Sequence, residues 1–382
     1  MSKGFPFRVG TRAAMKQLPR LRVSGNLHGA IVGGGAGAGI DNGRDPSLPL
    51  SVSITASRTT GASPLAVFFE VVIEGTSAPA RTFHHCGVHW DYGDPSSGTW
   101  AYGNSFLNSR DEDYAPMGSH VFEGAGPYTV TVTVTAPDGE TAQDTVEITP
   151  TAEDTAYAGA LTICLSNDAD FTGTPIGAIN TTLSSMSNAT FQTGYNAGIR
   201  RFLFKADDTF TITDFIALGY GISAGPVHIG RFGTGADPII TSASSNPVFN
   251  LSSDTASLGA VTEVSNDIRI VDLDIRNTST GDCIKNWGWH QKSTILRCNL
   301  RASNGSAVWF SYDQGEQQTS PLIDRNYYLF MHDCVADDSV ASTAMGNFAI
   351  NGRYISLKGN YKDGNSNENH GVRLYFVQDA LL

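Results

Sequence analysis

The clearest pattern along the chain is a strict alternation of apolar and hydroxylated residues in the first half. Val130, Val132 and Val134 alternate with threonines, so that one face of the segment is apolar and the other carries hydroxyl groups. Alternation with a period of two residues predicts a half-buried β-strand. The turn signal Pro137-Asp138-Gly139 ends this strand, and the alternating segment 145–148 predicts a partner strand after it.

A tight turn precedes this strand at Trp90-Asp91-Tyr92-Gly93-Asp94. Gly93 tolerates a positive φ, and the two Asp side chains can accept hydrogen bonds from the backbone of the turn. The segment therefore predicts the end of one strand followed by a sharp reversal. The side chain of Trp90 is expected to lie in the core of the fold.

Together with His120-Val121-Phe122 and Gly126-Pro127-Tyr128-Thr129-Val130, this turn makes residues 47–150 resemble a PKD-type module, a version of the immunoglobulin-like β-sandwich. The resemblance implies a spacer, an adhesive unit or a carbohydrate-associated appendage. The chain departs from the family pattern after Trp100, where an insertion carries an acidic run. This run, Asp111, Glu112 and Asp113, is either a partner or cation site or a solvated loop. No cofactor is expected, apart from Ca²⁺ if the run is a cation site.

From Leu161 onward the pattern changes to short apolar runs separated by Asn, Asp, Gly and Ser. Four runs align on Ile275, Leu300, Val335 and Tyr361, with spacings of 25, 35 and 26 residues. A single coil of this length cannot bury its own inward side chains, so successive coils must stack to form a core. We therefore expect stacked β-coils over residues 160–382.

This half of the chain resembles right-handed parallel β-helix proteins of the pectate-lyase-like superfamily, on stretches such as 199–205, 225–240 and 368–374. The expected fold class is all-β, with an immunoglobulin-like (PKD) β-sandwich followed by a right-handed parallel β-helix. The superfamily includes polysaccharide lyases, polygalacturonase-like hydrolases and bacteriophage spikes and fibres. Because the fold hosts both catalysts and binders, activity has to be argued from a site.

Two further segments complete the expected domain map. Residues 1–46 form a basic, glycine-rich arm, and residues 151–159 are small and polar and are expected to form a linker. The first 22 residues hold six Lys or Arg and no acid, among them Arg8, Arg12 and Lys16. The arm is either a disordered tail or a docking peptide that becomes ordered on a larger assembly. Its glycine-rich stretch does not resemble the apolar region of a secretory signal.

Composition narrows the range of partners. Charged residues make up 16% of the chain and there are 41 glycines, which is typical of an extracellular-style β protein. The formal charge of -12, despite the basic arm, argues against nucleic acid as the main partner. No apolar window in the sequence has the length of a membrane span. The five cysteines are widely spaced and odd in number, so their redox state stays open.

Residues with a catalytic pattern are few. A polygalacturonase-like site would need Gly-His-Gly and Arg-x-Lys, and neither accompanies the pair Asp337 and Asp338. Asp272 and Asp274 are expected to point to one side of a strand, either as catalytic carboxylates or as solvated residues. A non-catalytic protein is therefore favoured, and any activity would be that of a polysaccharide lyase or a glycoside hydrolase.

Aromatic residues near the loops between coils are a better indicator of function. Aromatic rings stack on sugar faces, so these residues are candidates for carbohydrate binding; the alternative is that they pack the turns. The candidates are Trp287, Trp289, His290, Trp309 and Tyr312.

The expected function is that of a virion-associated fibre, spike or decoration protein of a bacteriophage. Its basic arm would dock on other virion proteins and its β-helix would contact a host surface polysaccharide, as a monomer or a homo-oligomer. The pattern stops inside an expected strand at Leu381 and Leu382, so either another chain covers this end or the natural protein continues. The alternatives are a secreted, extracellular polysaccharide lyase or hydrolase and a non-catalytic adhesin on the bacterial cell surface.

Overall fold

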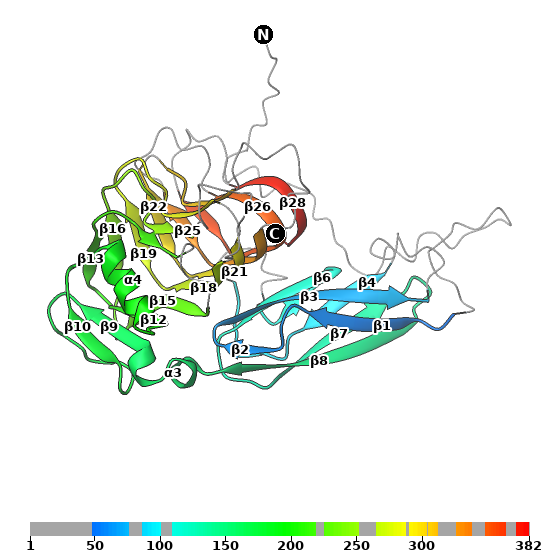
Figure 1. Ribbon diagram of the computed structural model, residues 1–382. Coiled ribbons are helices and arrows are strands. Elements are labelled where there is room, and N and C mark those ends of the chain that lie inside the picture. The colour runs from blue at the N-terminus through cyan, green and yellow to red at the C-terminus, as the bar shows by residue number, and fades with distance from the viewer. Residues whose placement is uncertain are drawn as a thin grey trace, which may run out of the picture.

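A computed structural model describes residues 48–75, 86–100, 109–218, 225–251, 265–287, 290–303, 305–311, 326–337, 348–363 and 372–381. Within these ranges the fold is all-β, as expected, with mainly antiparallel sheets in the first part of the chain and large parallel sheets in the second (Figure 1). The helices in these ranges are short: α3 (Glu153–Ala156), α4 (Asn188–Asn196) and the 3-10 turn η3 (Gly159–Leu161).

Two sheets that share one apolar core form the first unit, residues 48–151. The three-stranded sheet has the order β1 (Ser51–Ala56), β3 (Leu65–Glu74), β6 (Met117–Phe122). The five-stranded sheet has the order β2 (Thr60–Ala62), β8 (Thr141–Thr151), β7 (Tyr128–Thr135), β4 (Gly87–Asp91), β5 (Glu112–Asp113).

The alternating segment of the sequence is strand β7, and its apolar face supplies the middle of this core. Val130, Val132 and Val134 are fully buried and lie in one cluster with Phe69 of β3 and Trp90 of β4. β8 pairs antiparallel with β7 after the expected turn. The predicted strand, its partner and the core position of Trp90 are all confirmed.

The turn after β4 is held as its sequence indicates. Gly93 has φ 66°, and a Cβ added there would lie 2.5 Å from the Thr129 carbonyl oxygen. Asp91 accepts a hydrogen bond from the Gly93 backbone N–H at 2.9 Å. Asp94, in contrast, accepts hydrogen bonds through its carboxylate from the Ser96 hydroxyl at 2.9 Å and is paired with the His120 imidazole at 3.0 Å. One Asp therefore shapes the turn and the other ties it to β6.

Parallel strands stacked in three faces form the second unit, which begins after α3 and η3 (Figure 1). Face one contains β9 (Thr162–Ser166), β12 (Arg201–Lys205), β15 (Val227–Phe232), β18 (Ser265–Val271), β21 (His290–Leu296), β24 (Asn326–His332), and the later parts of β26 (Phe348–Lys358) and β28 (Val372–Leu381). Face two contains β11 (Ser185–Met186), β13 (Thr209–Ile212), β16 (Ile239–Ser242), β19 (Asp274–Asn277), β22 (Asn299–Ala302), β25 (Val335–Asp337) and β27 (Tyr361–Asp363). Face three contains β14 (Ile216–Ala217), β17 (Phe249–Asn250), β20 (Ile284–Trp287), β23 (Val308–Ser311) and the first parts of β26 and β28.

The chain visits faces one, two and three in turn, so each round is one coil of a β-helix-like stack. β26 and β28 each run from face three into face one, which joins these two faces into a single 13-stranded sheet. β10 (Ile179–Thr182) pairs with β9 beyond the first coil. After β11, the Ser187 side chain caps α4 by accepting from the Thr190 N–H, and α4 buries Phe191 against Phe202. One continuous apolar cluster fills the inside of the coils.

The register of face two corrects one step of the sequence alignment. Ile275 lies beside Leu300 and Val335 beside Tyr361, as the alignment has it. Leu300, however, lies beside Ala336 and not beside Val335. Because side chains alternate between the two sides of a strand, a shift of one residue exchanges inside and outside. The buried position is taken by the small Ala336, while the larger Val335 is half-buried. Aligning the strands on their most apolar residue therefore gave the wrong register at this step.

Single residues in the left-handed region form the corners between faces one and two. Asp272, Arg297 and Asp333 have φ between 50° and 55°, and Gly359 has φ 65° at the same place in the next coil. Because one residue with positive φ turns the chain sharply, a strand of face one can pass into face two without a loop. Three of these four corners are not glycine, so the sequence carries little sign of them.

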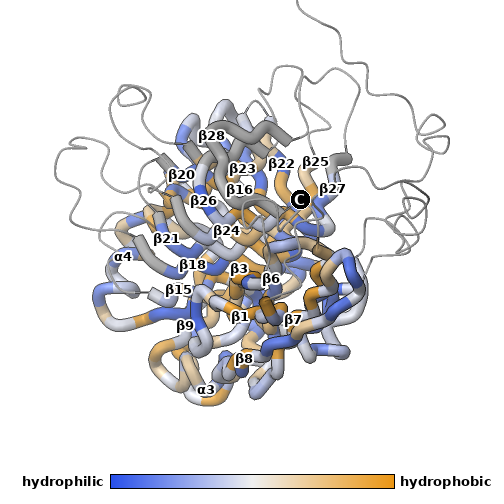
Figure 2. The backbone as a smooth tube through the Cα atoms, turned by 90° about the vertical axis from the view of Figure 1, so that its right-hand side faces the viewer, coloured by the Kyte–Doolittle hydropathy of each residue, from blue (hydrophilic) through white to orange (hydrophobic). Residues whose placement is uncertain are grey.

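The first unit packs against face one of the coils through an apolar patch, which we call the lateral interface. Strands β3 and β6 contribute Ala66, Phe68 and Val121. Four successive coils contribute one buried residue each: Val271, Leu296, Phe330 and Tyr354. Figure 2 shows the largely hydrophobic tube of β3 lying beside strands of face one. The two units are therefore joined by a shared core, which is more than a linker provides.

Polar contacts, most of them buried or half-buried, surround this apolar patch. At one end, Arg58 pairs with Asp267 at 2.7 Å, and Arg269 donates to the backbone carbonyl of Ser63. At the other end, the hydroxyls of Ser119 and Ser356 lie 2.7 Å apart. There the Lys358 ammonium binds the Asp113 carboxylate and donates to the Ser119 carbonyl at 2.8 Å. Arg297 pairs with Glu123 at 2.6 Å. Every charged group named here therefore has a partner across the interface or beside it.

Candidate functional site

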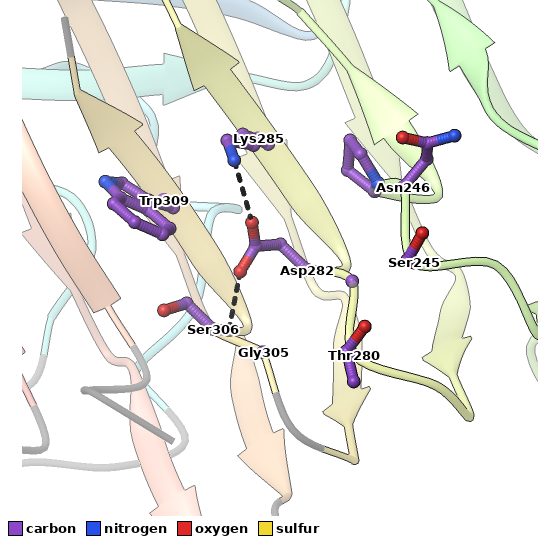
Figure 3. A pocket seen from close by; sticks show the side chains of 10 residues that line it. Ser245, Asn246, Thr280, Asp282, Lys285, Gly305, Ser306 and Trp309 are labelled. Atoms are coloured by element: carbon purple, nitrogen blue, oxygen red, sulfur yellow. Dashed lines mark hydrogen bonds and ion pairs between the residues drawn. The ribbon is translucent and has the colours of Figure 1, made fainter. Parts of the chain in front are cut away.

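A cavity of about 200 Å³ lies where the chain passes from face two into face three. Three successive coils supply its walls: the turn 245–247 before β17, the turn 280–282 before β20 and the turn 305–306 before β23 (Figure 3). The turns stack because the strands that follow them are in register, with Phe249 beside Ile284 and Ile284 beside Val308. Parallel stacking of the coils thus brings residues 60 positions apart into one cavity.

Two glycines allow the turns to approach this closely. A Cβ on Gly281 would lie 2.1 Å from the Asn246 carbonyl oxygen, and a Cβ on Gly305 would lie 2.3 Å from the Gly281 carbonyl oxygen. Any side chain at either position would push the turns apart. The buried Asn277 side chain holds the first two turns together, because its Nδ2 donates to the Asn246 carbonyl at 2.8 Å.

Asp282 is the acidic group of the cavity and is almost fully buried. Its Oδ1 accepts a hydrogen bond from the Ser306 backbone N–H at 2.7 Å, and its Oδ2 lies 3.7 Å from the Lys285 ammonium (Figure 3). Burial raises the pKa of Asp282 above its usual range, and the Ser306 N–H and Lys285 oppose this rise. The carboxylate is therefore held in place by the turn of the next coil.

Trp309 and Lys285 are register neighbours on the outer side of face three. The Lys285 Nζ lies 4.7 Å from the centroid of the Trp309 ring, within the range of a cation–π contact. This contact positions the ring at the edge of the cavity, facing the turn that carries Asp282 (Figure 3). The remaining walls include the polar side chains of Ser245, Asn246, Thr280 and Ser306, together with Pro247 and the two glycines.

This set of groups suits the binding of a hydroxyl-rich ligand. An indole ring offers an apolar face to the C–H groups of a sugar ring, and a carboxylate, an ammonium and hydroxyls bind its hydroxyl groups. Glycoside hydrolysis by the usual route needs a second carboxyl group across the bond. Among the described residues that line the cavity, Asp282 is the single acidic one.

The structure places one of the carbohydrate-binding candidates in the cavity. Trp309 lies there, on β23. Trp287 ends β20 and His290 begins β21, but their side chains lie outside the described residues, as do Trp289 and Tyr312 in full.

The candidate catalytic carboxylates lie elsewhere. Asp272 is the corner residue before β19 and so does not belong to the strand that begins at Asp274. The Asp272 carboxylate binds Arg297 at 2.6 and 3.0 Å, and Asp274 binds Arg276 at 2.9 and 2.7 Å. The expected pair on one strand face is thus divided between two arginines. Asp337 ends β25 with its side chain outside the described residues, and Asp338 lies outside them.

The acidic run of the first unit turns its side chains to different partners. Asp111 accepts from the Asp94 backbone N–H at 2.6 Å, Glu112 accepts from the Tyr114 hydroxyl at 2.9 Å, and Asp113 binds Lys358 and Tyr92. In the part of the chain that the structure describes, no group of three His, Cys, Asp or Glu side chains is arranged to hold a metal ion. The anchor candidates Arg8, Arg12 and Lys16 lie outside the described residues.

Two residues of the cavity, Asp282 and Lys285, were missed from the sequence. A repeat of 24 residues carries them: Gly281-Asp282-Cys283-Ile284-Lys285 aligns with Gly305-Ser306-Ala307-Val308-Trp309. Each copy consists of a glycine, a polar residue, a small residue, an aliphatic residue and a long side chain that lines the cavity. This pattern, followed on face three instead of face two, would have indicated the site.

Comparisons with known proteins assign no family to this arrangement. Neither a scan of the chain against protein-family models nor a search of curated proteins finds a match. No helix among the described residues is long and apolar enough to cross a membrane.

Proposed function

We propose that the protein is a polysaccharide-binding fibre or spike of a bacteriophage particle, and that the cavity of Asp282, Lys285 and Trp309 is where it holds a sugar. The main support for this proposal is that three successive coils bring an indole ring, a carboxylate and several hydroxyl groups to one surface cavity. Such a mixture of one aromatic face and few polar groups is characteristic of small-molecule sites.

The finer fold assignment is part of the same proposal. Two sheets around one core, with the Trp90 turn and the β7 alternation, support a PKD-type immunoglobulin-like sandwich. Parallel strands in three faces support a right-handed parallel β-helix of the pectate-lyase-like kind. The lateral interface favours a rigid body over a flexible pair of domains, which suits a protein that presents a site on a particle surface.

Replacing Trp309 by alanine is expected to weaken binding of the cognate polysaccharide about 30-fold, since a central aromatic anchor typically contributes 2 kcal/mol or more. The measurement is binding of the purified protein to polysaccharide extracted from candidate host bacteria. Tyr114→Ala is the matched control, because Tyr114 is an aromatic residue that is 55% exposed and lies on the first unit. Unchanged binding by Trp309→Ala would refute the assignment of the site. Release of oligosaccharides in the same assay would instead favour a secreted lyase or hydrolase.

The proposed anchor leads to a separate expectation for residues 1–46. Deleting them should leave both units folded, because neither the sandwich pattern nor the coil pattern of the sequence draws strands from that region. Incorporation into particles should fail. Reversing the charges of Arg8, Arg12 and Lys16 should weaken docking in a salt-dependent manner, as exposed charges are screened over about 10 Å at 0.1 M salt. The bound protein would be quantified by mass spectrometry of assembled particles. Equal incorporation of full-length and truncated chains would refute the anchor and favour a disordered tail, together with the secreted-enzyme and adhesin alternatives.

A further inference from the structure

The charges around the cavity restrict which sugars it suits. Among the described lining residues, the ionisable ones are Asp282 and Lys285, and their charges are opposite. The two groups lie 3.7 Å apart, so the cavity offers no net charge to a ligand. An anionic sugar would be attracted by Lys285, but its negative charge would then lie close to Asp282 and be repelled by it. The chain as a whole carries a formal charge of -12, which adds a long-range repulsion.

The hydrogen-bonding capacity of the cavity points the same way. An ionised carboxylate accepts about four hydrogen bonds, and the Ser306 N–H supplies one of them to Asp282. The Lys285 ammonium is too far from the carboxylate for a direct hydrogen bond at 3.7 Å. A hydroxyl group can bridge these two partners, because it donates to a carboxylate and accepts from an ammonium. A sugar carboxylate or sulfate ester can accept but cannot donate to Asp282.

We propose that the cavity selects a neutral, hydroxyl-rich sugar residue, stacked on Trp309 and donating its hydroxyls to Asp282, over uronate, sialyl and sulfated residues. This inference rests on the proposed glycan binding and adds the class of sugar. Ser245, Thr280 and Ser306 line the same cavity and offer further hydroxyls. The geometry therefore assigns Asp282 as the residue that distinguishes neutral from acidic glycans.

The test uses the full chain on an array of neutral and acidic oligosaccharides, followed by calorimetry of the tightest ligand. For a neutral ligand, Asp282→Asn should weaken binding about 10- to 100-fold, the range for losing a hydrogen bond to a charged group. Binding should not change with salt. For an acidic ligand, the same variant would bind more tightly, because a repulsion is removed, and added salt would weaken binding. Asp138→Asn, an exposed turn residue of the first unit, makes the same change in net charge and serves as the control.

A pH series gives an independent readout. Because burial raises the pKa of Asp282, its carboxylate becomes protonated at a higher pH than that of an ordinary Asp. Neutral-sugar binding should fall as the pH is lowered through this pKa, and Asp282→Asn should remove this part of the pH dependence. The charged side chain that faces Asp282 in the cavity is Lys285.

The outcomes separate the inference from the proposal beneath it. Tight binding of an acidic glycan, strengthened by Asp282→Asn, would overturn the neutral-sugar inference and leave glycan binding in place. Absence of binding to every glycan would overturn both. If Asp282→Asn melts well below the wild type, Thr280→Val replaces it, since Thr280 is exposed at the rim and the change removes one hydroxyl. A neutral sugar should then bind several-fold more weakly, and unchanged affinity would count against the inference.

Discussion

Replacing Asp113 by alanine is expected to destabilise the protein by about 3 to 5 kcal/mol, the range for removing one partner of a buried ion pair. Asp113 and Lys358 lie at the lateral interface with side chains that are 16% and 10% exposed. Burial lowers the pKa of Lys358, and the charge of Asp113 opposes that shift. Without Asp113 the ammonium stays desolvated and loses its counter-charge. The measurement is the free energy of unfolding from urea titration.

A double variant provides the control for this expectation. Asp113→Ala combined with Lys358→Met removes both charges, and replacing a buried pair by apolar groups is often close to neutral. Much of the lost stability should therefore return. A loss below about 1 kcal/mol in the single variant would show that the pair is solvated, and that the lateral interface opens in solution.

Replacing Trp90 by alanine should also cost about 3 to 5 kcal/mol, the range for emptying a large aromatic site in a core. Trp90 is fully buried, its ring centroid lies 5.7 Å from that of Phe69, and its Nε1 donates to the Ala115 carbonyl at 2.8 Å. The variant therefore leaves both a cavity and an unpaired carbonyl. Thermal or urea unfolding would measure the change.

Trp309→Ala is the matched control for this variant, because it deletes the same side chain from a half-buried position at the edge of the cavity. Its cost should be about 1 kcal/mol, as for an average substitution. Equal losses for the two variants would contradict the assignment of Trp90 to the core and of Trp309 to the half-buried edge of the cavity.

Local pattern was sufficient to predict strand β7 and two turns of the first unit. Val130, Val132 and Val134 specify which face of β7 is buried, and Gly93 and Gly139 mark turns that need a positive φ, of 66° and 89°. These signals act within a few residues of one another, so one sequence is enough to find them. The lateral interface has no such signal. Ser119 and Ser356, for example, meet across 237 positions, and only the packing of the two units brings them together.

In the coils, inward residues were easier to predict than corners. Ile275 and Leu300 were aligned correctly because both are large and buried, whereas the small Ala336 was passed over for Val335. The corner at Arg297 has φ 50° in a residue type that seldom adopts it, and it is held by Asp272 and Glu123 from other segments. Such a corner depends on tertiary contacts, so the neighbouring residues in the sequence do not indicate it.

The candidate site was predicted in part, for a similar reason. Trp309 stood out as an aromatic residue near a loop, but Asp282 and Lys285 are ordinary residues until the turns of three coils are stacked. Their role depends on Gly281 and Gly305, which set the spacing of those turns. The two sequence candidates Asp272 and Asp274 were chosen for their spacing, and their arginine partners could not be inferred from that spacing.

The lateral interface changes how the stack of coils can come apart. In an array whose repeats contact only their neighbours, coils can fray one after another from an end. Here the first unit contacts four consecutive coils at once, through Val271, Leu296, Phe330 and Tyr354. Loss of any one of these coils weakens the hold on the other three, so the four should melt as a single cooperative block. Hydrogen exchange along β18, β21, β24 and β26 should therefore converge on one common opening free energy.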